Sequence, residues 1–287
     1  MTITPRRQER QRLRDRPRIR TGLSIIPSLF TIGNMFCGYY SVVSTMRENY
    51  DLAAIAIGVG AVLDMLDGRI ARMTRTTSEF GLQLDSLADV LTFGIAPAVL
   101  ALNWGVGSLP GLPAEIAQDV YHFGWLSTFG FLICGALRLA RFNSQARRPS
   151  DGSISKIDFV GLPIPAGAAV IASIVHFEES PLLGVASALL WCLLVVLLAS
   201  FMISRIRYTS FKQLDLKKPQ PRTTIVGTAM LIGLIVFYSE IVLLVLAMAY
   251  LVSGPAARLS YSVRRLLLVH DEGGEISKPH AEGGRDL

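Results

Sequence analysis

The sequence predicts an all-α integral membrane protein with about eight transmembrane helices. Of its 287 residues 51% are hydrophobic and 17% are charged, and the mean hydropathy is +0.44. Soluble domains contain about one quarter charged residues, so this composition favours a chain that lies mostly in lipid. The net charge is +6, but the basic residues cluster between apolar runs, which indicates membrane topology rather than nucleic-acid binding.

A helix needs about 20 apolar residues to cross the hydrocarbon core of a bilayer. The apolar segment 225–252 is too long for one upright span, and Tyr238, Ser239 and Glu240 interrupt it. It therefore predicts two short helices joined by a tight turn. The expected spans are 25–46, 52–66, 82–102, 125–141, 160–177, 182–203 and the two parts of 225–252. Segment 103–121 is rich in Gly and Pro and contains no Lys or Arg, so we expect an outer loop there.

The basic residues are distributed asymmetrically across these spans. With the N-terminus in the cytoplasm, all 28 Lys and Arg residues except Arg47 fall on the cytoplasmic side. The positive-inside rule therefore predicts that both termini are cytoplasmic, in the inner membrane if the chain is bacterial. We expect a basic cytoplasmic or juxtamembrane arm at 1–24, a transmembrane catalytic domain at 25–255 and a polar cytoplasmic tail at 256–287. Anionic lipid headgroups are a possible partner of the arm.

Four aspartates lie within or beside the apolar runs. Asp64 and Asp67 share one stripe of a helix, and Asp85 and Asp89 share another. The mostly polar segment 73–80 suits a cytoplasmic hairpin turn that points the two stripes towards each other. The stripes also carry small residues and one arginine, at Gly68, Ala71, Arg72 and Gly81.

Carboxylates that converge in lipid need compensating charge. One aspartate at the centre of a membrane helix costs about 2.5–3.5 kcal/mol, and four together also repel one another. Oxygen ligands without sulfur or imidazole nearby favour Mg²⁺ or Mn²⁺, with Ca²⁺ as another possible occupant. Four carboxylates balance about two divalent ions, so the pattern predicts a two-metal site for phosphoryl transfer.

The spacing of these residues resembles the signature of the CDP-alcohol phosphatidyltransferases. Eight residues fill it: Asp64, Asp67, Gly68, Ala71, Arg72, Gly81, Asp85 and Asp89. Members of that family are membrane enzymes with a six-helix core that use a CDP-linked lipid or alcohol and divalent metal. The stretches IPSLFTIGNMFCGYYSV, SEFGLQLDSLADVLTFGIAPA, CGALRLARFN and FVGLPIPAG resemble its phosphatidylserine synthase branch, with Ser28 as a departure from that branch.

The resemblance implies a role for each matching residue. Asp64, Asp67 and Asp85 would bind one ion, and Asp89 would replace Asp67 at the second. Asp89 would also be the general base for the acceptor hydroxyl. The CDP pocket would be formed by Gly68, Ala71, Arg72 and Gly81, with Thr31 and Asn34 of the first helix facing the same nucleotide.

Two arginines follow in CGALRLARFN, near the cytoplasmic end of the fourth helix. Arg138 and Arg141 are spaced i, i+3. They either anchor the helix by snorkelling or bind an anion, namely the phosphatidyl phosphate or the serine carboxylate. Lys156 is a weaker candidate for the same role.

These observations and the resemblance predict transfer of a phosphatidyl group from CDP-diacylglycerol to L-serine, which gives phosphatidylserine and CMP. The resemblance further implies a homodimer. Glycerol phosphate, inositol phosphate or choline are alternative acceptors. Two other functions are alternatives. An intramembrane prenyltransferase also binds a metal diphosphate through aspartates, but its Asp-rich motifs are more widely separated than the four aspartates here. A divalent-cation transporter would carry acidic residues through the depth of the membrane, and the remaining expected spans lack them. No nucleic-acid partner is expected.

Overall fold

The structure is a computed structural model that describes residues 25–74, 79–146, 161–206, 208 and 222–275. These residues form helices and contain no strand, so the expected all-α class is confirmed. They make eight helical rods, one of which contains a π-helical segment, η1. The rods are α3 (Ile25–Met46), α4 (Tyr50–Thr74), α5–η1–α6 (Glu79–Asp89, Val90–Ile95 and Ala96–Val106), α7 (Ala114–Ala146), α8 (Ile164–Glu178), α9 (Val185–Ile203), α10 (Arg222–Phe237) and α11 (Ser239–Glu275).

Four helices of the described ranges are long and apolar enough to cross a membrane: Glu79–Val106, Ala114–Ser144, Val185–Ile203 and Ser239–Arg258. Helix α8 and the apolar part of α10 are shorter. The predicted break near Tyr238 is confirmed, because α10 ends at Phe237 and α11 begins at Ser239. The chain is thus an all-α membrane protein, and the number of eight spans stays a prediction.

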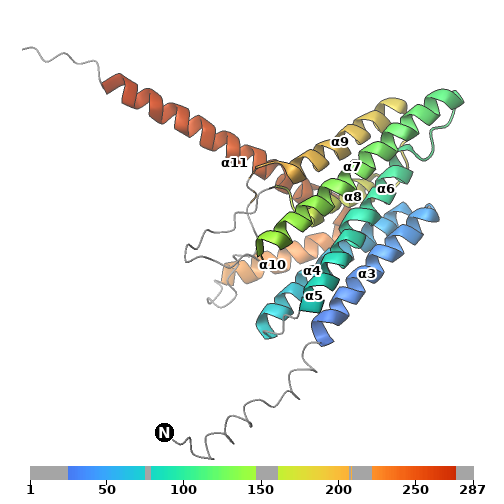
Figure 1. The fold of residues 1–287 in the computed structure, drawn as a ribbon, viewed down its shortest axis with the longest axis horizontal. Coiled ribbons are helices and arrows are strands. Elements are labelled where there is room, and N and C mark those ends of the chain that lie inside the picture. Colours follow the sequence, from blue (N-terminus) through green and yellow to red (C-terminus); the bar gives the residue numbers. More distant parts are fainter. Residues whose placement is uncertain (1–24, 75–78, 147–160, 207, 209–221, 276–287) are drawn as a thin grey trace, which may run out of the picture.

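Two boundaries differ from the expected ones. Helix α6 continues to Val106 and α7 already begins at Ala114, so most of the expected loop 103–121 is helical. Helix α11 runs on to Glu275 and takes up the first part of the expected polar tail. In Figure 1 this end of α11 extends away from the other helices. The expected arm at 1–24 lies outside the described residues.

Some polar side chains are buried between the helices, and many large apolar side chains are exposed on the surface of the bundle. On α3, Thr31, Asn34, Ser41 and Thr45 form a stripe that is at most 5% exposed. Large apolar side chains on the same helix, such as Phe36 at 64%, are exposed. This distribution is the one expected where lipid surrounds the protein, because association then depends on close packing and on polar contacts between helices.

The helices pack around a large apolar core, and Val106, Val120, Ala188 and Cys192 form a second, smaller cluster. Helix α3 lies along α4, α7 lies along α9, and α8 packs against both α4 and α11 (Figure 1). The α5–η1–α6 rod contacts α3 through all three of its parts. At the α6 end, Trp104 and Trp191 of α9 meet edge to face, with ring centroids 4.9 Å apart. The rod is therefore held along its whole length.

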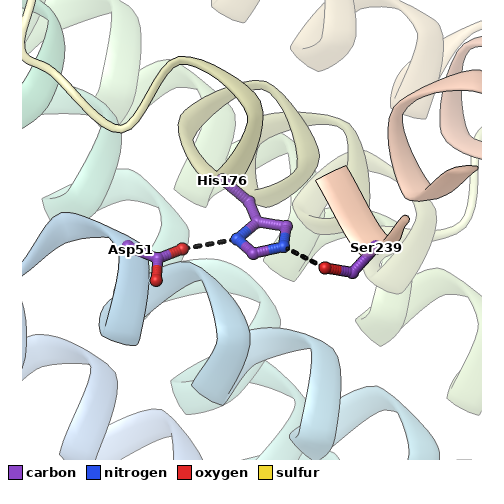
Figure 2. Close-up of polar contacts among 3 residues, drawn as sticks. All are labelled: Asp51, His176 and Ser239. Carbon is purple, nitrogen blue, oxygen red and sulfur yellow. Dashed lines mark hydrogen bonds and ion pairs between the residues drawn. The ribbon is translucent and has the colours of Figure 1, made fainter. Parts of the chain in front are cut away.

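A polar cluster, which we call the His176 clasp, joins α4, α8 and α11 (Figure 2). His176 in the last turn of α8 pairs through Nδ1 with Asp51 in the first turn of α4. Its Nε2 lies 2.9 Å from the hydroxyl of Ser239, the first residue of α11. The order acid, imidazole, hydroxyl is that of a hydrolase triad. His176 is only 8% exposed, however, which leaves little room for a substrate, so we interpret the cluster as a link between helix ends.

Loss of the His176 clasp should lower the stability of the protein but leave metal binding by the aspartates unchanged. His176→Ala removes both contacts, and we expect it to lower the free energy of unfolding by about 1–3 kcal/mol. Asp51 lies about 20 Å along α4 from Asp64, so binding of Mn²⁺ should not change. Heating in detergent while following helical circular dichroism checks the first expectation. His122→Ala, at an exposed histidine of α7, is the control. Equal melting of the two variants would contradict the clasp.

Candidate active site

The aspartates converge at one end of the bundle, which we call the aspartate end. Asp64 and Asp67 lie in the last part of α4, and Asp85 lies in α5. One carboxylate oxygen from each of these three residues lies within 4.8 Å of those of the other two. The facing stripes that the spacing predicts are therefore present. Such a cluster of oxygen donors could hold a divalent metal ion.

Asp89 closes the cluster from the last residue of α5. Its carboxylate lies within electrostatic range of the three other aspartates. The Oδ1 atom of Asp89 is buried and has no hydrogen-bond partner among the described residues. A buried carboxylate oxygen without a partner is costly, so it indicates a place for a cation or for a proton. The cluster of Asp64, Asp67 and Asp85 thus fits a divalent metal ion, and Asp89 lies beside it.

Helix α3 supplies the nearest polar support. Thr31 is 5% exposed and donates a hydrogen bond from Oγ1 to Oδ2 of Asp67, over 3.0 Å. This bond fixes the orientation of a carboxylate that is itself only 4% exposed. Asn34, one turn further along, is fully buried, and neither atom of its amide has a hydrogen-bond partner among the described residues. The sequence predicts that Thr31 and Asn34 both face the nucleotide. In the structure Thr31 bonds to a site aspartate, whereas the Asn34 side chain is fully buried.

The remaining expected pocket residues are placed unevenly. Gly68 follows Asp67 in α4, and Gly81 lies one turn before Asp85 in α5. Both glycines are partly exposed. Ala71 and Arg72 belong to α4, but their side chains lie outside the described part of the structure, as does Lys156 altogether.

The structure distinguishes the two arginines of α7. Arg138 is half-buried, and its guanidinium lies within electrostatic range of Asp89 and of Tyr250 on α11. Its Nη2 lies 3.5 Å from the carbonyl oxygen of Gly161, and its Nε is buried without a partner among the described residues. Arg141 is exposed. Arg138 therefore belongs to the inside of the aspartate end, which snorkelling does not explain.

Two contacts of the site were not anticipated from the sequence. Asn143 donates from Nδ2 to the hydroxyl of Ser86, over 2.8 Å, which ties the end of α7 to the helix that carries Asp85. Asn143 belongs to the stretch CGALRLARFN, and its position close to the two arginines in the sequence is the feature that could have identified it. The second contact is the electrostatic interaction between Arg138 and Tyr250. Tyr250 lies in an apolar part of α11, five residues before Pro255, and its sequence surroundings do not indicate a role in the site.

Comparison with known proteins agrees with this geometry. The family model described as CDP-alcohol phosphatidyltransferase matches residues 24–189. A Helicobacter pylori (strain ATCC 700392 / 26695) protein named CDP-diacylglycerol–serine O-phosphatidyltransferase is 36% identical over 197 residues, which cover 67% of this chain and 74% of the relative.

Two more relatives carry the same name. The one from Bacillus subtilis (strain 168) is 35% identical over 193 residues, covering 67% of this chain and 93% of the relative. The one from Saccharomyces cerevisiae (strain ATCC 204508 / S288c) is 37% identical over 155 residues, covering 51% of each. With the aspartates at the family spacing and gathered at one end of an all-helical bundle, the chain belongs to the CDP-alcohol phosphatidyltransferase family.

Proposed function

We propose that this protein transfers the phosphatidyl group of CDP-diacylglycerol to the hydroxyl of L-serine and releases CMP. The observation that carries the proposal is the convergence of Asp64, Asp67 and Asp85, with Asp89 against them, at the end of membrane helices. Serine as the acceptor is supported by the names of the relatives from Helicobacter pylori and Bacillus subtilis.

The transfer is a displacement at phosphorus. The serine hydroxyl oxygen forms a bond to the phosphorus that carries diacylglycerol, and the bond from that phosphorus to the bridging oxygen of CMP breaks. The hydroxyl proton passes to a carboxylate, for which Asp89 is the candidate because its buried Oδ1 has no partner among the described residues. Exclusion of water around Asp89 favours serine over water as the nucleophile.

Divalent ions fit the charge of the substrate as well as that of the site. Asp64, Asp67, Asp85 and Asp89 would hold two ions, Mg²⁺ or Mn²⁺. When bound, such ions neutralise the diphosphate and the departing CMP. The hydrogen bond from Thr31 keeps Asp67 oriented for this task. We expect Gly68 and Gly81 to let the nucleotide approach the backbone closely.

Arg138 is the cationic residue that we assign to substrate binding. Its guanidinium is held inside the aspartate end near Asp89, where a planar fork suits a phosphate or a carboxylate. Arg141 is exposed and suits anchoring at the membrane surface. We do not include Asn34 among the nucleotide contacts, because it is fully buried between helices.

The placement of the basic residues supports a cytoplasmic aspartate end with both termini on the same side. On that side serine would reach the site from water, while the diphosphate of CDP-diacylglycerol lies at the membrane surface and its acyl chains stay in lipid. The family resemblance also supports a homodimer.

The deciding experiment is an acceptor panel. We expect purified protein in mixed micelles with CDP-diacylglycerol and Mn²⁺ or Mg²⁺ to release CMP with L-serine, and not with glycerol phosphate, inositol phosphate or choline. A chelator should stop the release. CMP release with another acceptor alone would replace serine, whereas metal flux in vesicles without CMP release would favour a cation transporter.

Asp89→Asn tests the general base. We expect turnover to fall by about 100-fold or more, because the amide cannot take the serine proton, while CDP binding is largely kept. CMP release and CDP binding by calorimetry measure the two effects. Asp119→Asn, at an exposed aspartate of α7, is the matched control. Normal turnover in Asp89→Asn would refute the assigned role.

Arg138→Ala tests the assigned cation. Loss of a charge-assisted contact should raise the KM for serine or for CDP-diacylglycerol by about ten-fold or more. Arg141→Ala removes the same charge from an exposed position one turn away and should leave both KM values within about two-fold. Unchanged KM values in Arg138→Ala would return this residue to anchoring.

A further inference from the structure

The rod that carries Asp85 and Asp89 changes its helical type directly after Asp89. Residues Val90–Ile95 form a π-helical segment, and the N–H of Ala96 bonds to the carbonyl of Leu91, five residues back. Pro97 follows and cannot donate to the preceding turn. π segments are rare and often occur at functional sites. A π turn holds one residue more than an α turn, which rotates α5 about 100° relative to α6.

Thr92 holds this segment from its centre. It is fully buried, and its Oγ1 donates to the carbonyl oxygen of Asn34 on α3, over 2.9 Å. Gly38 on α3 lets the segment approach, since a Cβ there would lie 2.8 Å from Cα of Thr92. Gly60 on α4 does the same, since its Cβ would lie 2.7 Å from Cγ2 of Thr92. Thr92 is thus the point where α3, α4 and the π segment meet.

Helices α3 and α4, and helix α5 directly before the π segment, carry Thr31 and the four aspartates of the active site. Thr92 comes three residues after Asp89, and α3 also supports Asp67 through Thr31. Helix α4 carries Asp64 and Asp67, and both lie within electrostatic range of Asp89. The rotation of α5 about its axis decides whether Asp85 and Asp89 face α4, and the π segment sets that rotation.

We propose that Thr92 is a positioning residue for the reaction. Its hydroxyl, bonded to the Asn34 carbonyl, locks the π segment between α3 and α4 and so directs Asp85 and Asp89 at Asp64 and Asp67. The inference rests on the proposed function for its effect on turnover. Its effect on the site itself is independent of any substrate.

Thr92→Val tests the hydroxyl, because valine keeps the shape and removes the donor. We expect kcat to fall about 10- to 100-fold, since small misplacement of catalytic groups has effects of that size. The Mn²⁺ concentration for half-saturation, followed by electron paramagnetic resonance without substrate, should rise several-fold. Thr92→Ser restores the donor and should bring both values back to within about three-fold of the original protein.

Thr45→Val is the matched control. Thr45 is also buried on α3, at 1% exposure, and its Oγ1 donates to the carbonyl of Ser41, over 2.9 Å. Both valine variants lose a buried threonine hydroxyl, but the bond of Thr45 runs within α3 whereas that of Thr92 joins the π segment to α3. Only Thr92→Val should weaken Mn²⁺ binding and turnover. Equal Mn²⁺ binding in the two variants, or a Thr92→Ser protein as poor as Thr92→Val, would overturn the proposal.

Failure of the proposed function and failure of the variant to fold can each be distinguished from failure of this proposal. If serine-dependent CMP release is missing from the original protein, the proposed function fails, while the Mn²⁺ titrations still decide the role of Thr92. If Thr92→Val does not fold, Gly60→Ala decides instead, because its added methyl presses on Cγ2 of Thr92 and on Oδ1 of Asn34, where the π segment meets α3 and α4. We expect the same several-fold loss of Mn²⁺ affinity, and unchanged affinity would overturn the proposal.

Discussion

Mutual repulsion among four carboxylates in a medium of low dielectric is the constraint on which this structure depends. Asp64, Asp67, Asp85 and Asp89 gather at the end of helices whose outer surfaces are apolar. Without compensation such a cluster would force its helices apart. The protein meets this constraint in two ways. Polar contacts from neighbouring helices, which we call the cage, hold the aspartates together, and the proposed reaction uses their negative charge. Divalent cations would balance the charge of the carboxylates together with that of the substrate diphosphate.

The cage is built by neighbours of the acidic helices rather than by the helices alone. Thr31 of α3 donates to Asp67, Asn143 of α7 reaches Ser86, and Arg138 of α7 lies near Asp89. These contacts come from segments distant in the sequence, and each acts where lipid could not replace it. The His176 clasp secures the opposite end of α4, so that this helix is held at both of its ends.

The parts of the fold that depend on helix periodicity could be predicted from the sequence. The two aspartate stripes follow from i, i+3 and i+4 spacing, and the break at Tyr238 follows from polar residues in an overlong apolar run. The π segment could not be predicted in this way. Pro97 signals an irregularity, but its form depends on contacts with Gly38 and Gly60 of other helices.

The direction in which a side chain points could likewise not be predicted from the local sequence pattern. Arg138 and Arg141 are one turn apart and differ by about 60° around α7, so only the neighbours decide which one points inward. Asn34 has the helical spacing of a site residue, but α4 and the π segment close over it. The roles of the pocket residues themselves stay predictions, because periodicity identifies a face and not a ligand.

The irregular rod has a consequence for how sequences of this kind can diverge. Seven residues separate Asp89 from Pro97. Of these seven residues only Ile95 is exposed, and the others are buried or half-buried. A single deletion would convert the π turn to an ordinary α turn and swing the acidic stripe away from its partner helix. Chain length there is therefore constrained as well as composition, because the direction of Asp85 and Asp89 depends on the number of residues in the segment.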